Sequence, residues 1–236
     1  VDVTVHQTRH LNLARNHTAT HLLQAALRKV LGNHVNQAGS LVTPDHLRFD
    51  FTHFSPVTQA ELDAIENLVN EEILKNIPVT IEEMSIDDAK EKGAMALFGE
   101  KYGDVVRVVS VDDFSCELCG GSHVDNTSVI GSFRITGESG TGSGVRRIEA
   151  VTGAAALVLA KSESRELQQL ADMLKAKVGD TTAKLEALLA QAKGLEKELA
   201  QLKKEAAMSD MDSILAGKED IGGVSVITAE AQADSM

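Results

Sequence analysis

Two pairs of side chains that can bind a metal constrain this chain more than any other feature. His17 and His21 lie four residues apart, and Cys119 and His123 have the same spacing. On a helix, residues four apart project from the same face, so the two histidines can approach one ion. The Gly-Gly turn after Cys119 lets a thiolate and an imidazole fold back toward one point. Because 98 residues separate His21 from Cys119 (119 minus 21), such a site would be tertiary.

The donor atoms of the two pairs indicate which metal the chain would bind. Three imidazoles and one thiolate suit a borderline-soft, tetrahedral ion, and zinc is the usual ion for that set. The alternative is that the cysteine is a small buried apolar residue and the histidines are hydrogen-bonded polar residues. The joint occurrence of both pairs favours metal binding. No glutamate follows His17 as it does in the HExxH helix of zinc proteases.

Charge and cysteine content limit the class of protein. The formal net charge of −12 over 236 residues argues against sequence-independent coating of nucleic acid, but it is compatible with a small basic groove. Two cysteines cannot build a disulfide framework, and a metal-binding thiolate fits a reducing compartment, so we expect a cytoplasmic protein. We expect no membrane partner, because no apolar run is long enough to span a bilayer and no signal-peptide pattern is present. The N-terminal valine indicates a piece of a longer protein.

Residues 1–153 mix helical and strand patterns and predict one α+β domain. Apolar residues at helical spacing predict two helices, over about 16–31 with Asn16 as N-cap and over about 62–74. Extended patterns predict strands at 40–43, 46–52, 79–81, 105–109, 129–136 and 144–151. We therefore expect a mixed or antiparallel sheet and a long helix that carries the histidine pair.

The composition changes sharply after Gly153. Residues 154–208 are rich in Ala, Leu, Lys, Glu and Gln, with leucines at the spacing typical of coiled coils. A break at 178–180, where Gly179 can end one helix and Asp180 can cap the next, favours an antiparallel helical hairpin over an intermolecular coiled coil. Residues 209–236 contain one strand pattern and predict the start of a truncated C-terminal domain or a disordered tail. We expect any oligomer to form through the missing C-terminal part.

Four ordered sequence blocks closely resemble the editing domain of alanyl-tRNA synthetase. They are residues 16–23 (NHTATHLL), 37–40 (QAGS), 117–123 (ELCGGSH) and 140–150 (GTGSGVRRIEA). The similarity covers essentially residues 1–153. The free-standing AlaX-type editing proteins and the editing domain of threonyl-tRNA synthetase share part of the pattern. The helical segment and the strand after it are similar to the spacer and the start of the C-terminal domain, which favours a synthetase fragment.

The resemblance implies zinc-dependent editing of mischarged tRNA(Ala), which is hydrolysis of the ester that joins serine or glycine to the 3′-terminal ribose. A pocket that accepts alanine cannot strongly reject the smaller glycine and discriminates poorly against an added hydroxyl, so a second site must remove the errors. One alternative is a non-catalytic module, stapled by zinc, that binds tRNA or supports assembly. The acidic charge and the long helical segment favour that alternative. Another is hydrolysis of an unrelated ester or amide at an open metal site.

The resemblance also assigns the metal ligands. His17, His21, Cys119 and His123 match the zinc ligands of the family. Cys116 competes for the thiolate role, because it forms a CxxC with Cys119. The family pattern places the ligand directly before Gly-Gly, which favours Cys119.

Two further residues are expected to act in catalysis. Thr20 matches a threonine tied to recognition of the serine hydroxyl, and the alternative is packing or a hydrogen bond to the helix carbonyls, for which Thr18 is the better candidate. Gln37 matches a residue tied to editing. Its amide would orient the attacking water or hold the ester carbonyl, and the alternative is an ordinary loop hydrogen bond.

A glycine-rich segment precedes two arginines. Gly140, Gly142 and Gly144 offer unhindered backbone amides for an anion, and arginine can bind phosphate through two hydrogen bonds. On composition alone a flexible hairpin is an equal alternative, and no Walker motif is present. With the resemblance, we expect these glycines, Arg146 and Arg147 to bind the 3′ end of the tRNA. On a strand, only one of the two arginines can point into a pocket.

Overall fold

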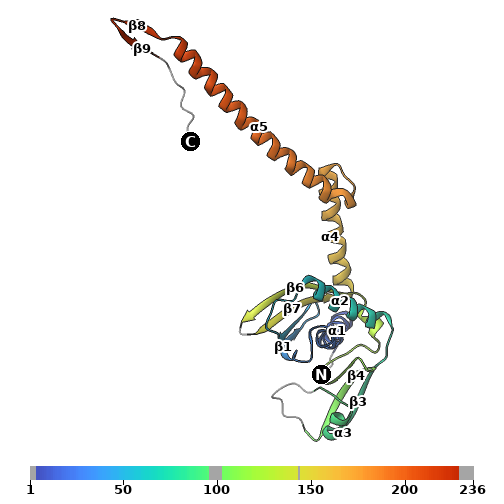
Figure 1. Ribbon diagram of the computed structural model, residues 1–236. Helices are drawn as coiled ribbons and strands as arrows, with labels where there is room; N and C mark the ends of the chain where they lie inside the picture. Colours follow the sequence, from blue (N-terminus) through green and yellow to red (C-terminus); the bar gives the residue numbers. More distant parts are fainter. Residues whose placement is uncertain (1–3, 96–102, 143, 229–236) are drawn as a thin grey trace. The chain divides into compact units, whose positions relative to one another are not determined.

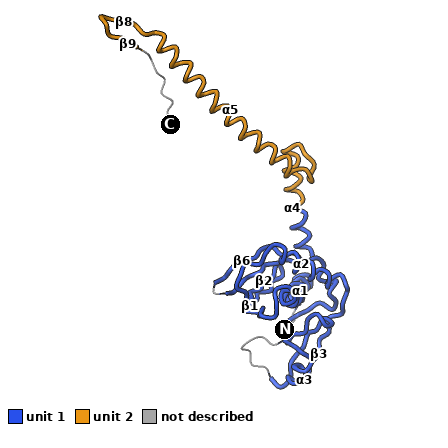
Figure 2. The backbone as a smooth tube through the Cα atoms, viewed as in Figure 1, with its two compact units in different colours: residues 1–163 blue, residues 164–236 orange. Residues whose placement is uncertain are grey.

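The computed structural model describes residues 4–95, 103–142 and 144–228, and the chain divides into two compact units, residues 1–163 and 164–236 (Figure 2). Ser143, within the predicted glycine-rich segment, lies outside the described residues. The predicted α+β class is confirmed (Figure 1). The three-part division at 153 and 208 stays a prediction. Among the described residues, no helix is long and apolar enough to cross a membrane.

A four-stranded antiparallel sheet forms the centre of the first unit. Its order is β1 (Gln37–Val42), β2 (Leu47–Thr52), β7 (Val145–Thr152) and β6 (Phe133–Gly142). Two helices, α1 (Gln7–Leu31) and α2 (Gln59–Leu74), pack against this sheet. Alternate residues of β2, Leu47, Phe49 and Phe51, are buried and form the core with the leucines of α1. The alternation follows the two-residue period of a strand with one covered face.

The long helix α1 begins earlier than predicted. It starts at Gln7 with His6 as N-cap, so the predicted start at Asn16 is wrong. No glycine or proline lies between residues 7 and 31, and nothing in that stretch ends a helix. Asn16 instead lies in the core, where its Nδ2 donates to Thr43 O at 2.8 Å and its Oδ1 accepts from Thr152 Oγ1 at 2.7 Å. These bonds tie α1 to both the β1–β2 turn and β7.

The first unit also contains a smaller antiparallel sheet. Its order is β3 (Val79–Ser85), β4 (Val105–Val111) and β5 (Ser115–Leu118), and the short helix α3 (Ile86–Glu91) packs on it. β5, which the sequence analysis did not predict, leads directly into Cys119. The predicted strand over 129–136 is partly wrong, because Thr127–Ile130 form a 3-10 turn and β6 begins only at Phe133.

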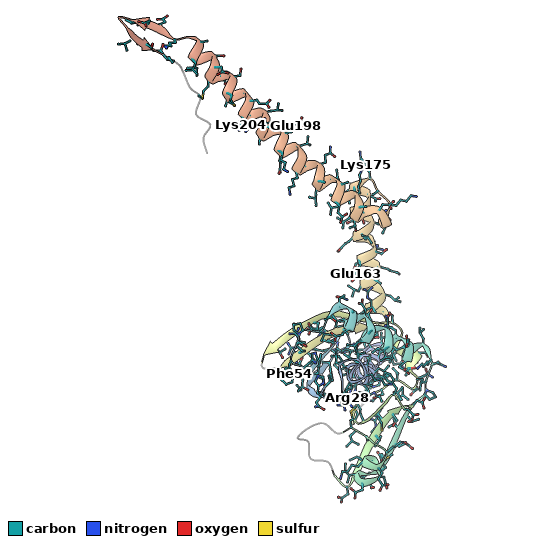
Figure 3. All side chains as sticks on the ribbon, viewed as in Figure 1. Arg28, Phe54, Glu163, Lys175, Glu198 and Lys204 are labelled. Atoms are coloured by element: carbon teal, nitrogen blue, oxygen red, sulfur yellow. The ribbon has the colours of Figure 1, made fainter. Side chains whose placement is uncertain are left out.

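The second unit contains the end of α4 (Gly153–Leu174), a 3-10 turn (Val178–Asp180) and α5 (Thr181–Ala216). Two helices form on either side of a break, as predicted, but α4 ends at Leu174 rather than at Gly179, and Asp180 makes no side-chain cap hydrogen bond. The leucines of the two helices do not form a packed seam. No residue of α5 is buried, and Leu188 and Leu195 are 41% and 57% exposed. Figure 3 shows the side chains along α5, with Glu198 and Lys204 labelled. The predicted lone strand is also wrong, since β9 (Val224–Val226) pairs with β8 (Glu219–Ile221).

Candidate metal centre

Four side chains from two distant parts of the chain meet beside α1. His17 and His21 project from the middle of the helix, and Cys119 and His123 come from the loop that follows β5. One ligand atom from each residue can be chosen so that all four atoms lie within 4.8 Å of one another. The four residues predicted to bind a metal are therefore brought together. Figure 1 labels α1, which carries the histidine pair, and β3 and β4 of the small sheet.

The rings are oriented with Nε2 toward the sulfur. His17 Nε2 lies 3.5 Å from Cys119 Sγ, and His123 Nε2 lies 3.3 Å from the same sulfur. The rings of His17 and His123 stack with 4.3 Å between their centroids. Three imidazole nitrogens and one sulfur fit a tetrahedral ion such as zinc, and the donor set alone does not fix which metal.

Burial keeps the three imidazoles neutral at neutral pH. It lowers the pKa of His17, and it lowers the pKa of His123 to about 3, with the charges of neighbouring histidine and Arg107 acting in the same direction. Burial also lowers the pKa of His21 well below its ordinary value, with smaller contributions from the other two histidines. A neutral imidazole has a lone pair for a metal, so these ligands lose no proton on binding.

The outer nitrogens of two rings have partners within the fold. His123 Nδ1 lies 3.1 Å from Thr18 Oγ1, and the same hydroxyl accepts a hydrogen bond from Val124 N at 3.2 Å. A backbone hydrogen bond with Ser122 raises the pKa of His17, against the larger effect of burial. Because Nε2 of His17 faces the sulfur, Nδ1 is the nitrogen left for Ser122. Such partners fix the tautomer and the orientation of a metal-binding imidazole.

Arg107 on β4 holds the loop that carries Cys119. Its Nη1 donates to the carbonyl oxygens of Cys119 and Gly121, both at 2.7 Å, and Cys119 N donates to Arg107 O at 3.0 Å. Gly121 N in turn lies 3.4 Å from Cys119 Sγ. A loop held at three backbone groups keeps the thiol at one place relative to β4.

Cys116 is not part of the cluster. It lies three residues before Cys119, and its Sγ accepts a hydrogen bond from Ser110 Oγ at 3.4 Å. Among the residues that the structure describes, the group that could hold an ion contains Cys119 and not Cys116.

Thr20 and Gln37 are placed differently from one another. Thr20 is 4% exposed, and its Oγ1 donates to Asn16 O at 2.8 Å, so Thr20 makes the helix hydrogen bond that was expected of Thr18. Gln37 begins β1, and its Nε2 donates to Ser40 Oγ at 3.4 Å rather than to a cluster side chain. The expected catalytic roles of both residues stay predictions.

The two arginines already have carboxylate partners. Arg146 Nε and Nη2 each lie 2.5 Å from an oxygen of Glu138, and Arg147 donates to both oxygens of Asp50 at 2.7 and 2.8 Å. The hydrogen bond from Arg147 lowers the pKa of Asp50. The two side chains, which are neighbours on β7, contact different carboxylates, and which of them would face a tRNA pocket stays a prediction. An anion at either arginine would have to replace or join a carboxylate.

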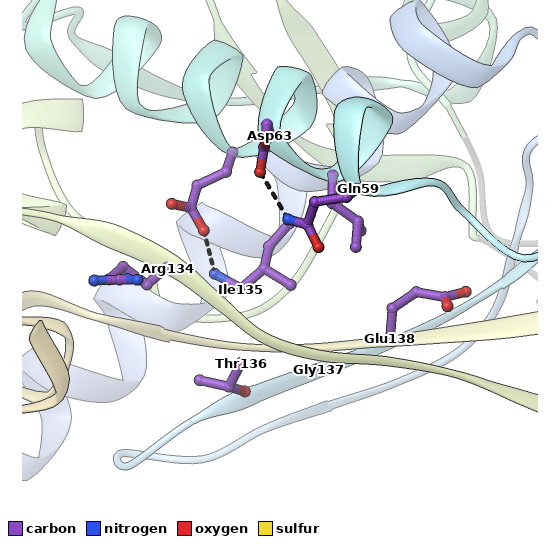
Figure 4. Close-up of a pocket in the computed structure, with 9 residues that line it drawn as sticks. Gln59, Asp63, Arg134, Ile135, Thr136, Gly137 and Glu138 are labelled. Atoms are coloured by element: carbon purple, nitrogen blue, oxygen red, sulfur yellow. Dashed lines mark hydrogen bonds between the residues drawn. The ribbon is translucent and has the colours of Figure 1, made fainter. Parts of the chain in front are cut away.

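The cavity drawn in Figure 4 is separate from the cluster. It has a volume of about 400 Å³ between α2 and β6, and its lining includes Asp63, Glu66, Arg134 and Glu138. Figure 4 shows Gln59 hydrogen-bonded to Asp63, four residues later on α2. None of the predicted metal ligands lines this cavity.

Sequence patterns do not predict the contacts that three residues make at the cluster: Thr18, Arg107 and Glu117. Thr18 directly follows His17, and that adjacency was the only available signal. Arg107 and Glu117 lie in strands, and their proximity to the cluster depends on pairing of β4 with β5, which no local pattern shows.

Replacing Thr18 with valine should lower the free energy of unfolding of the metal-free protein by about 1–3 kcal/mol, because the buried Val124 N–H then loses its acceptor. Urea unfolding in the presence of a chelator, followed by NMR signals of residues 14–27, measures the loss. Thr20→Val is the matched control, since its hydroxyl bonds only to a helix carbonyl that already accepts within the helix. Equal stability of T18V and the wild type would contradict the assignment of Thr18.

Comparison with known proteins gives one family and a consistent set of relatives. Residues 106–149 match the model described as "Threonyl and Alanyl tRNA synthetase second additional domain". The chain is 54% identical over 229 residues to an alanine–tRNA ligase of Acetivibrio thermocellus, which covers 97% of this chain and 26% of that protein. The ligase of Desulfitobacterium hafniense is 54% identical over 236 residues, covering 100% and 27%, and that of Geobacillus kaustophilus is 51% identical over 232 residues, covering 98% and 26%. The chain spans about a quarter of the length of these relatives.

Proposed function

We propose that this chain is the proofreading part of an alanine–tRNA ligase. The premise is that the chain corresponds to a segment of these ligases that includes their second additional domain. The proposed reaction is hydrolysis of the ester in Ser-tRNA(Ala) and Gly-tRNA(Ala). The proposed cofactor is zinc, and the proposed partner is the acylated 3′ end of tRNA(Ala). The observation that carries the proposal is the convergence of His17, His21, Cys119 and His123 on one point within a chain of this similarity.

The cluster has the properties that a zinc site needs. It offers three neutral imidazoles and one sulfur, and the rings of His17 and His123 present Nε2 toward the sulfur. When bound, zinc would supply a Lewis acid if one coordination position opens, and a fixed geometry if all four ligands stay bound. The chain's own contribution is to hold the four side chains in place through Thr18, Ser122 and Arg107.

Gln37 and Thr20 are the residues that we propose to act on the substrate. In this proposal the Gln37 amide gives up its 3.4 Å contact with Ser40 and orients a water molecule or the ester carbonyl. The Thr20 hydroxyl donates to Asn16 O, which leaves its oxygen lone pairs free to accept from a serine hydroxyl. Alanine has no such hydroxyl and would gain nothing from Thr20, which is the discrimination that editing requires.

The glycine-rich segment and the arginines are proposed to face the 3′ end of the tRNA. Gly140 lies directly beside the Arg146 guanidinium, since a Cβ on Gly140 would come within 2.8 Å of Nη1. The missing side chain makes room for that guanidinium, and the backbone amides of the segment could help to bind an anion. We propose that the phosphate shares Arg146 with Glu138.

A second candidate function follows from the number of candidate ligands, because four protein ligands would leave no coordination position open for a substrate. Four protein ligands around one ion are typical of structural zinc, which would make the domain a stapled module that binds tRNA or supports assembly without catalysis. The two functions differ in their dependence on Gln37 and Thr20, because neither residue supplies a ligand.

The zinc-loaded protein should release serine from Ser-tRNA(Ala) and leave Ala-tRNA(Ala) nearly intact. Release of labelled amino acid, measured at several protein concentrations with a chelator-treated control, tests this.

Gln37→Ala should slow serine release by about 10²-fold if the amide orients the water, in line with general effects of orienting groups. Gln59→Ala, a glutamine in the separate cavity, is the matched control. Equal background hydrolysis of both tRNAs by zinc-loaded protein would rule out the deacylase and leave the stapled module.

A further inference from the structure

His21 is the ligand whose outer nitrogen has no hydrogen-bond partner in the described structure. The residue is 5% exposed, and its Nδ1 is buried without a donor or acceptor within hydrogen-bond distance. His17 and His123 differ, because the Ser122 backbone hydrogen-bonds to His17 and Thr18 Oγ1 lies 3.1 Å from His123 Nδ1. A buried imidazole nitrogen without a partner is costly, so this position needs an explanation.

A buried carboxyl group lies beside that nitrogen. Glu117 Oε2 lies 3.7 Å from His21 Nδ1, and Glu117 is 6% exposed. Its other oxygen, Oε1, accepts a hydrogen bond from Ser115 Oγ at 3.2 Å, which turns the carboxyl plane and leaves Oε2 toward His21. The proposed function does not use Glu117, although a carboxylate is rarely buried without a reason.

The backbone around Glu117 is fixed from both sides. Glu117 pairs with Val109 on β4 and forms a bridge with Met95, and the neighbouring Leu118 N donates to Met95 O at 2.9 Å. Glu117 lies in β5, and Cys119 follows it two residues later in the loop after the strand. One short stretch thus delivers both a ligand and a carboxylate to the cluster.

We propose that Glu117 is a positioning residue for the metal centre, whose carboxylate accepts the Nδ1–H of His21 and so directs Nε2 of that ring toward the ion. The inference rests on the proposed metal site and deepens it. The 3.7 Å separation needs to shorten by less than 1 Å to give a hydrogen bond of ordinary length. A carboxylate behind a metal-binding histidine fixes the tautomer and makes the ring a stronger ligand.

Cobalt(II) titration of the full chain tests the proposal, because the absorption of the bound ion reports both affinity and tetrahedral geometry. Glu117→Ala should weaken Co²⁺ binding by about 10–100-fold, the usual effect of losing an outer partner of a ligand. Glu117→Gln should weaken it less than Glu117→Ala, because an amide oxygen still accepts from Nδ1–H. Cys116→Ala, on the same strand but outside the cluster, is the matched control and should bind as the wild type does.

The outcomes separate this inference from the metal site itself. If the wild type does not bind Co²⁺, the metal centre and this inference both fail. If the wild type binds and Glu117→Ala binds as tightly, the role of Glu117 is wrong and the metal centre stands. If the NMR spectrum of metal-free Glu117→Ala shows that this variant does not fold, the proposal can still be tested on the wild type. A ¹H–¹⁵N correlation of the zinc-loaded protein must then show the His21 proton on Nδ1, and a proton on Nε2 would overturn the proposal.

Discussion

Zinc added to the metal-free protein should raise the melting temperature of the first unit by about 8–16 °C. A free ion concentration 1,000-fold above the dissociation constant stabilises the folded state by about 4 kcal/mol, provided that the unfolded chain binds weakly. For a unit of this size, each kcal/mol shifts the melting temperature by about 2–4 °C. Weak binding by the unfolded chain is expected, because the two halves of the site are 98 residues apart (119 minus 21).

Differential scanning calorimetry with and without chelator measures the zinc effect. It can resolve two transitions, which matters because residues 1–163 and 164–236 form separate compact units and need not melt together. The zinc shift should vanish in the double variant His21→Ala, Cys119→Ala and persist in Cys116→Ala. A wild type whose melting is indifferent to zinc would contradict the metal centre.

Replacing Gly121 with alanine should weaken metal binding by about 5–150-fold. A Cβ at this position would lie 2.0 Å from Cε1 and 2.4 Å from Nδ1 of His17, closer than any real contact. The ring has little room to retreat, because it stacks on His123 and its Nε2 faces Cys119 Sγ. Overpacking of this kind costs about 1–3 kcal/mol, which converts to the stated range at 1.4 kcal/mol per tenfold.

Gly120→Ala is the control for that variant. A Cβ on Gly120 would meet no atom within 4 Å, and its backbone is not in the left-handed region, so the substitution should change affinity less than threefold. Co²⁺ titration of both variants makes the comparison. Equal affinities would mean that the ring of His17 does not lie against Gly121 in the metal-bound protein.

The convergence of the four candidate ligands was predictable because the two halves of the cluster are local patterns. A pair of histidines four apart on a helix and a Cys-Gly-Gly turn each fix their own geometry, and only their meeting depended on the fold. The α+β class followed likewise from helical and two-residue periodicities, which are properties of short windows.

What the sequence could not predict depends on contacts between distant segments. Thr18 was assigned to its own helix because its partner, His123, is 105 residues away along the chain. The carboxylate partners of Arg146 and Arg147 follow from the registers of β6 with β7 and of β2 with β7. In α5, the leucine spacing predicted a packed seam, but periodicity states only that one face is apolar and not whether anything covers it.

The long separation within the proposed metal site also bears on how the protein would acquire an ion during synthesis. At about 5–20 residues per second, roughly 5–20 s pass between translation of His21 and translation of Cys119. During that interval the nascent chain offers only the two imidazoles of His17 and His21. Two ligands compete poorly with other zinc-binding molecules. Stable capture waits until β5 has paired and its loop has docked against α1. The ratio of zinc to protein in a preparation would then report the fraction of molecules in which this loop has docked. That measurement does not need an activity assay.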